Sequence, residues 1–184
     1  MRVKTSLKNH RFIACALLIA CLAGVSIMVS SVATAQTIFR EQLVVGASGL
    51  PIPRFVSLSA SEANLRTGPN QQYPILWVFV RRGTPLEVTA EYGAWRRVRD
   101  VDGTVGWMHS ALLSGTRTAL LTGTLRTVFA DPSINSEAVL RAEAGVLGTI
   151  NTCTAGWCQL NVHGRVGWLP QEHFWGTYSN ESFE

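Results

Sequence analysis

The chain has 184 residues, a length that allows one or two domains. Its formal net charge of +4 arises entirely within residues 1–35, which contain Arg2, Lys4, Lys8 and Arg11 and no acidic residue. The rest of the chain has equal numbers of arginines and acidic residues and no lysine. This balance argues against a basic nucleic-acid-binding surface and against a charged interaction tail, so no nucleic-acid partner is expected.

Residues 1–35 have the three zones of a secretory signal peptide. A basic start precedes an apolar run over residues 12–29, and small residues occupy positions 32–35. We therefore expect cleavage after Ala35 and a periplasmic or secreted protein. Two alternatives remain open: the apolar run is long enough to stay as a membrane anchor, and residues 18–21 resemble a lipobox, although the apolar stretch continues beyond Cys21.

The sequence after the leader contains one pattern twice, with corresponding residues 61 to 63 positions apart. The shared features are Trp95, Asp102-Gly103 and Gly106-Trp107 in the first copy, and Trp157, His163-Gly164 and Gly167-Trp168 in the second. This period is too long for one solenoid unit and suits two tandem domains. The expected organisation is a linker at 36–49, domains at 50–119 and 120–178, and a C-terminal tail at 179–184.

The local patterns in each copy are typical of strands and turns. Residues 76–80 form a β-branched and aromatic run, and residues 85–90 and 95–101 alternate in polarity. Asp102-Gly103 predicts a hairpin turn, and residues 110–113 predict one short helical turn. Residues 137–143 have helical propensity, but their equivalent in the first copy is the 76–80 strand, so we predict a strand. Each copy then has about five strands, which suits a small closed barrel.

Residues 63–69, Ala-Asn-Leu-Arg-Thr-Gly-Pro, resemble the opening signature of bacterial SH3-like (SH3b) domains, and residues 95–107 resemble their central hairpin. Residues 112–119 resemble the exit of the first domain in a tandem, exported subfamily. The resemblance spans about residues 50–178 and implies an all-β protein with two tandem SH3-like β-barrels. Some members of the family bind cell-wall peptidoglycan or target a hydrolase to it, and others mediate protein contacts. The second copy departs at residues 128–132, Val-Phe-Ala-Asp-Pro, which puts a ligand role for its entry loop in doubt.

The aromatic residues divide into repeated and unrepeated sets. Trp95, Trp107, Trp157 and Trp168 recur at equivalent places, so we predict that they form the structural cores. Tyr73 and Trp77 have no aromatic counterpart in the second copy, and they lie near a Gly-Pro loop. We predict a ligand-binding groove formed by Arg66, Tyr73, Trp77 and Tyr92, in which rings stack on a sugar or peptide and the guanidinium pairs with a carboxylate. Trp175 and Tyr178 are expected to pack across the domain boundary.

Cys153 and Cys158 are the two cysteines that follow the leader. Opposite one another on a hairpin, they would lie within disulfide range, and an oxidising compartment favours the bond. A zinc site with His163 and His173 is an alternative, but the histidines are too widely spaced for the usual ligand pattern. A catalytic Cys-His pair would need a free thiolate.

No phosphate-binding glycine loop, serine nucleophile elbow or His-Glu-x-x-His motif is present in the sequence. We therefore expect a non-catalytic binding module without a cofactor or metal, whose partner is peptidoglycan or an envelope protein. Membrane contact is expected only through an uncleaved leader. The alternatives are an accessory subunit that targets a separately encoded cell-wall hydrolase, and a structural protein-protein interaction module that uses an exposed sheet edge.

Overall fold

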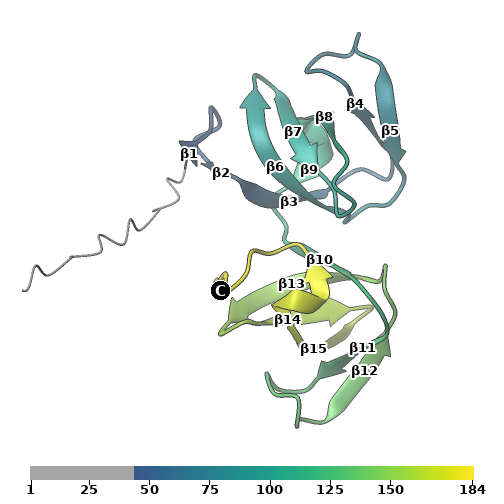
Figure 1. The fold of residues 1–184 in the computed structure, drawn as a ribbon, viewed down its shortest axis with the longest axis vertical. Coiled ribbons are helices and arrows are strands. Elements are labelled where there is room, and N and C mark those ends of the chain that lie inside the picture. The colour runs from purple at the N-terminus through teal and green to yellow at the C-terminus, as the bar shows by residue number, and fades with distance from the viewer. Residues whose placement is uncertain (1–43) are drawn as a thin grey trace, which may run out of the picture. The chain divides into compact units, whose positions relative to one another are not determined.

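The computed structural model describes residues 44–184, and the predicted signal peptide, its cleavage position after Ala35 and most of the predicted linker lie outside these residues. The described elements are antiparallel strands and two short 3-10 turns, so the protein is all-β as predicted (Figure 1). Over residues 44–184, no helix has the length and apolar character needed to cross a membrane.

The first barrel is a seven-stranded antiparallel sheet in the order β5-β4-β8-β7-β6-β3-β9. Its elements are β3 (Arg54–Leu58), β4 (Ala63–Arg66), β5 (Ile75–Phe79), β6 (Pro85–Tyr92), β7 (Trp95–Arg99), β8 (Val105–His109), η1 (Ser110–Leu112) and β9 (Leu113–Ser114). The predicted strands, the glycine turn at Gly103 (φ 84°) and the helical turn η1 are all present.

The second barrel repeats this arrangement strand for strand in the order β12-β11-β15-β14-β13-β10-β16. Its elements are β10 (Thr118–Leu121), β11 (Arg126–Phe129), β12 (Ala138–Ala142), β13 (Leu147–Thr154), β14 (Trp157–Val162), β15 (Arg165–Pro170), η2 (Gln171–His173) and β16 (Phe174–Trp175). The prediction of a strand within residues 137–143 is confirmed by β12. The structure thus shows the duplicated barrel that the repeat predicts.

The boundary between the barrels lies slightly earlier than the predicted division after residue 119. The first sheet ends at Ser114, and Thr118 and Ala119 already pair with β13 of the second sheet. Residues 44–49 of the predicted linker belong to a hairpin ahead of β3, because β1 (Val44–Val45) pairs with β2 (Pro51–Ile52) at the start of the predicted first domain.

A buried carboxylate joins this N-terminal hairpin to the first barrel. The Glu91 carboxylate accepts hydrogen bonds from the backbone amide and hydroxyl of Ser48, both at 2.7 Å, and from Arg54 at 2.7 Å. Arg96 lies 3.2 Å from the same group. Burial opposes ionisation of Glu91, but the Ser48 hydrogen bonds and the two guanidinium groups prevail and lower its pKa to about 2.

Each barrel has its own hydrophobic core, made mainly of aliphatic side chains. In the first barrel the core consists of Val56, Leu58, Ala63, Leu65, Phe79, Leu86, Val88, Val98 and Met108. In the second it consists of Ala119, Leu121, Val128, Ala142, Ile150, Cys153, Cys158, Leu160, Val162, Leu169 and Phe174.

The prediction that Trp95, Trp107, Trp157 and Trp168 form the cores is wrong, because all four are half-buried and lie outside both clusters. The strand pleat gives the reason. In β8 the buried residues are Gly106 and Met108, so the intervening Trp107 faces outward. The glycine of the Gly-Trp step is the inward residue, since a Cβ at Gly106 would lie 2.6 Å from the Leu65 side chain and 2.8 Å from the Arg66 carbonyl oxygen.

Aromatic residues near the C-terminus pack against the first barrel, as predicted. The rings of Trp175 and Tyr178 each lie 4.9 Å from that of Phe55 on β3. The Tyr178 hydroxyl donates a hydrogen bond of 3.1 Å to the buried carboxylate of Glu87. Burial and the negative charge of Glu87 both raise the pKa of Tyr178 well above its ordinary value, so its hydroxyl keeps its proton and remains a donor.

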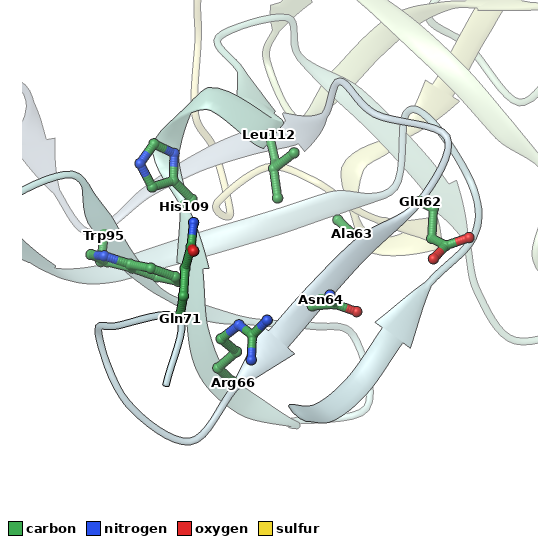
Figure 2. A pocket seen from close by; sticks show the side chains of 8 residues that line it. All are labelled: Glu62, Ala63, Asn64, Arg66, Gln71, Trp95, His109 and Leu112. Carbon is green, nitrogen blue, oxygen red and sulfur yellow. The ribbon is translucent and has the colours of Figure 1, made fainter. Parts of the chain in front are cut away.

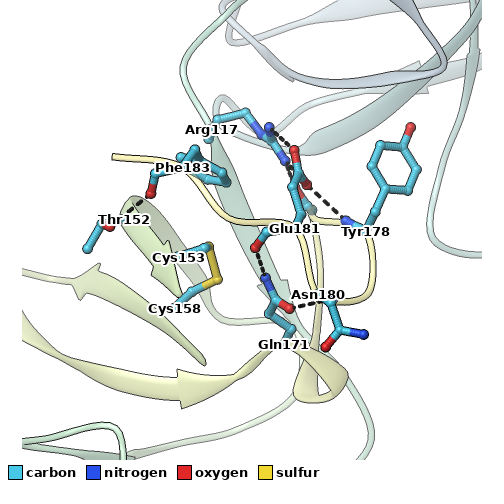
Figure 3. Close-up of a disulfide and its surroundings, with 10 residues drawn as sticks. Arg117, Thr152, Cys153, Cys158, Gln171, Tyr178, Asn180, Glu181 and Phe183 are labelled. Atoms are coloured by element: carbon cyan, nitrogen blue, oxygen red, sulfur yellow. Dashed lines mark hydrogen bonds and ion pairs between the residues drawn. A yellow bond between two sulfur atoms is a disulfide. The ribbon is translucent and has the colours of Figure 1, made fainter. Parts of the chain in front are cut away.

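The predicted C-terminal tail packs against the second barrel (Figure 3). The Phe183 and Cys153 backbones exchange two hydrogen bonds. Arg117 forms a bidentate salt bridge with the Glu181 carboxylate, with hydrogen bonds of 2.8 and 2.9 Å. Burial opposes ionisation of Glu181, but its hydrogen bonds from Arg117 and the Tyr178 amide prevail and lower its pKa. The guanidinium carbon of Arg117 also lies 4.7 Å from the ring centre of Phe183.

Candidate functional site

A hollow of about 260 Å³ opens on the first barrel (Figure 2). Three strands supply its principal side chains, with Arg66 at the end of β4, Trp95 at the start of β7 and His109 at the end of β8. Its lining consists of Glu62, Ala63, Asn64, Arg66, Gln71, Trp95, His109 and Leu112. The hollow therefore offers a guanidinium, a carboxylate, an imidazole and an indole.

Arg66 is positioned by the β4–β5 loop. Its Nη1 donates a hydrogen bond of 2.8 Å to the Tyr73 carbonyl oxygen. The loop is closed by the Thr67 amide, which donates to the Pro74 carbonyl oxygen at 3.0 Å, and the Tyr73 ring covers Gly68 so closely that a Cβ there would lie 2.6 Å from it. Within residues 44–184, Arg66 forms no salt bridge. Its remaining N–H groups can therefore donate to a bound carboxylate.

Trp95 and His109 are cross-strand partners on β7 and β8. Their rings meet edge-to-face, with centres 5.4 Å apart and planes at 85°. The Nδ1 atom of His109 accepts a hydrogen bond of 3.2 Å from the Ala111 amide, so the neutral ring carries its proton on Nε2. The pair supplies an aromatic surface and one N–H donor beside the Arg66 guanidinium.

The equivalent surface of the second barrel lacks the guanidinium and the imidazole. Phe129 pairs with Trp168 as Arg66 pairs with Trp107, and the Phe129 ring lies 6.0 Å from that of Trp157. Pro170 is opposite Trp157, at the place of His109. A hollow of about 660 Å³ beside Trp157 is lined by neutral side chains and one carboxylate. The lining of the Arg66 hollow is therefore not a requirement of the barrel itself.

The four predicted ligand residues do not share one groove. Arg66 lines the hollow, and Tyr73 touches it through the hydrogen bond of its carbonyl oxygen. Tyr92 lies opposite Trp95 across the β6–β7 hairpin with its ring exposed, and it does not line the hollow. Trp77 is 59% exposed on β5, where it pairs with Leu65, and it also lies outside the lining.

Sequence reasoning missed several residues of the hollow. The repeat predicts a core position for Trp95, and no site role is predicted for His109, Gln71 or Glu62. The sequence does contain a signal for His109. The second copy has Pro170 at the equivalent position, so the imidazole is not repeated, and the lack of a counterpart is the same criterion that favours Tyr73 as a ligand residue. No comparable signal marks Gln71 or Glu62.

The predicted disulfide is present between Cys153 and Cys158, which face one another on β13 and β14 (Figure 3). Both sulfur atoms are used in this bond. They are therefore not available as zinc ligands with His163 and His173, nor as a nucleophile. Among residues 44–184, no cluster of three or more potential metal ligands occurs.

Comparison with known proteins finds a match to the bacterial SH3 domain in two segments, residues 59–115 and 124–176. Among curated proteins, the chain is similar to the putative N-acetylmuramoyl-L-alanine amidase YrvJ of Bacillus subtilis, with 23% identity over 127 residues. The aligned region covers 63% of this chain and 24% of that protein. The chain thus spans about a quarter of the length of this relative.

Three solved structures are also similar. NlpC2 of Trichomonas vaginalis has a TM-score of 0.33 and 13% identity, over 68% of this chain and 49% of that one. NlpC1 of the same organism has a TM-score of 0.32 and 14% identity, over 74% and 50%. An NlpC/P60 family protein of Bacillus cereus has a TM-score of 0.31 and 14% identity, over 68% and 57%. The family match covers more than half of the chain, with one segment in each barrel, and the chain therefore belongs to the bacterial SH3 domain family.

Proposed function

We propose that this protein is an exported, non-catalytic module that binds peptidoglycan through the Arg66 hollow of its first barrel. The observation that carries the proposal is the meeting, in one hollow, of an indole, an imidazole and a guanidinium that forms no salt bridge within residues 44–184. The leader pattern at residues 1–35 supports export. Family membership supports a binding role, and the likeness to a putative N-acetylmuramoyl-L-alanine amidase supports the wall as the target.

Peptidoglycan carries the chemical groups that this hollow can recognise. Its peptides have carboxylates, which a guanidinium pairs with through two parallel hydrogen bonds, and Arg66 has donors to spare. They also carry amines, which can donate hydrogen bonds to the carboxylate of Glu62, the lining residue that directly precedes β4. The Trp95 ring offers a surface for an apolar peptide side chain or a sugar face.

The proposal is tested by co-sedimentation of the purified protein with insoluble peptidoglycan. Arg66→Gln removes the charge that pairs with the carboxylate, and because a charge-assisted hydrogen bond contributes about 1.5–3 kcal/mol, retention should fall by about tenfold or more. Arg82→Gln is the matched control, since Arg82 is an exposed arginine of the same barrel outside the hollow. Thermal melting of both variants shows whether the fold is preserved.

The outcomes separate binding chemistry from nonspecific attraction. Selective loss of retention in Arg66→Gln, and weaker retention by peptidoglycan whose carboxylates are amidated, would support the proposal. Equal loss in both variants would indicate a diffuse charge effect. No retention of the wild-type protein would reject wall binding.

The likeness to part of a putative amidase also supports a second candidate, an accessory role for a separately encoded wall hydrolase. In that case, retention by peptidoglycan would require the hydrolase, and the two proteins would purify together from cells. Retention of the isolated protein distinguishes the direct role from the accessory one.

A further inference from the structure

One edge of the first barrel is unusually apolar. Strand β5 is the terminal strand of its sheet, hydrogen-bonded to β4 on one side. On and beside it, six large apolar or aromatic side chains are between 39% and 74% exposed: Tyr73, Ile75, Leu76, Trp77, Val78 and Val80. Exposed neighbours such as Trp77 and Val78 lie on opposite faces of the strand, so both faces are open.

The second barrel shows that the fold does not require this edge. Its equivalent strand β12 has a charged Arg141 within it and follows Glu137, while Val139 and Leu140 are half-buried. Charged side chains and short edge strands are the usual means by which a free sheet edge is protected against pairing with a strand of another chain. From residue 73 to residue 80, the first barrel has no charged side chain at all. The unprotected edge is therefore specific to the first copy.

We propose that β5 is the dimerisation edge of this protein, on which the β5 strand of a second copy pairs in antiparallel orientation across a two-fold axis near Trp77. A two-fold contact uses the same surface on both copies, so an edge that is apolar from end to end is complementary to itself. Main-chain hydrogen bonds would extend the sheet, and the exposed side chains would pack in pairs above and below it.

The charges nearest to the edge are compatible with this arrangement. Val80 separates β5 from Arg81 and Arg82, which are the nearest charged residues along the chain to the apolar segment 73–80. Across the sheet, Arg66 on the inner neighbour β4 pairs with Ile75. In an antiparallel pair centred near Trp77, the arginines of one copy lie at the opposite end from those of the other. A parallel pairing would place like charges side by side, which is destabilising.

The surface available also meets the requirement of a stable interface. The half-exposed Tyr73 and Trp77 rings leave roughly 200 Å² open, given the 150–250 Å² that such a ring can bury. The four aliphatic side chains add roughly 200 Å². Two copies would then cover roughly 800 Å² of apolar surface, which for an interface slightly more than half apolar corresponds to roughly 1,400 Å² in total. Specific interfaces bury roughly 1,200–2,000 Å².

Sedimentation equilibrium of the purified protein, between about 1 and about 100 µM and without wall material, tests the proposal. We expect a monomer-dimer equilibrium that Trp77→Lys weakens at least about tenfold, because two ammonium groups would then meet near the axis. Ala138→Lys is the matched control, since it adds the same charge to an exposed position on the equivalent strand β12. Its dimer should be as stable as that of the wild type.

Hydrogen exchange gives a second readout that does not depend on a variant. The amides of β5 should become more protected as the protein concentration rises, whereas those of β12 should not change. A monomer at the highest concentration, or a dimer that Trp77→Lys leaves intact, would overturn the proposal. So would protection of β5 that requires peptidoglycan, because the edge would then be a wall-binding surface. A monomeric result alone would leave the role of the Arg66 hollow intact.

Discussion

The clearest test of the core assignment is a comparison between two neighbours on β8. Met108 is 0% exposed within the first core, whereas Trp107 is half-buried on the outer face. Met108→Ala removes a fully buried side chain and leaves a cavity, so we expect it to lower the free energy of unfolding by about 3 kcal/mol. Trp107→Ala removes a larger side chain from a surface that water can fill, and we expect a loss of about 1 kcal/mol.

Urea denaturation followed by far-ultraviolet circular dichroism measures both changes, and hydrogen exchange of the β7 and β8 amides assigns them to the first barrel. The second barrel provides an independent replicate, because Leu169 is buried and Trp168 is half-buried at the equivalent positions. If Trp107→Ala destabilised the barrel as much as Met108→Ala, Trp107 would be a core residue. The assignment of Met108 to the inner face of β8 and of Trp107 to its outer face would then be refuted.

Further predictions concern the disulfide, the buried carboxylate and the Gly-Trp step. Breaking the Cys153–Cys158 bond with a reductant should lower stability by about 2 kcal/mol, seen as a lower melting temperature. Because folding lowers the pKa of Glu91 from 4.5 to about 2, its contribution is complete above pH 4.5 and is lost as the pH falls towards 2. Glu91→Gln should reduce this acid sensitivity in denaturation curves taken across that range. Gly106→Ala should cost about 1–3 kcal/mol, because the new methyl group meets Leu65 and the adjacent backbone, and a melting temperature equal to that of the wild type would contradict the close approach.

The repeat was the most informative feature of the sequence for the fold. It predicted two equivalent barrels, and it indicated a strand within residues 137–143, where β12 lies, although their local propensity favours a helix. Repetition was misleading for the tryptophans, because equivalent places on an outer face recur as regularly as those in a core. The alternation of residues 95–99 indicates the outward position of Trp95. Alternate residues of a strand share a face, so Trp95 lies on the same face as the exposed Arg97 and Arg99.

The candidate site was less predictable because it depends on strand register. Arg66 meets the other lining residues only because β4 pairs with β8, where Arg66 is opposite Trp107. The β4–β5 loop then fixes the guanidinium through the Tyr73 carbonyl oxygen, a backbone contact that residue identities do not encode. Arg66 was predicted from its chemistry, but its neighbours required the three-dimensional pairing.

Amide NMR spectra of the protein titrated with soluble peptidoglycan fragments test the central claim most directly. We predict shifts confined to the first barrel, at Arg66, the Trp95 indole and His109, with Phe129 and its surroundings in the second barrel unchanged. Shifts centred on the second barrel, or spectra that do not change at saturating fragment concentration, would contradict it.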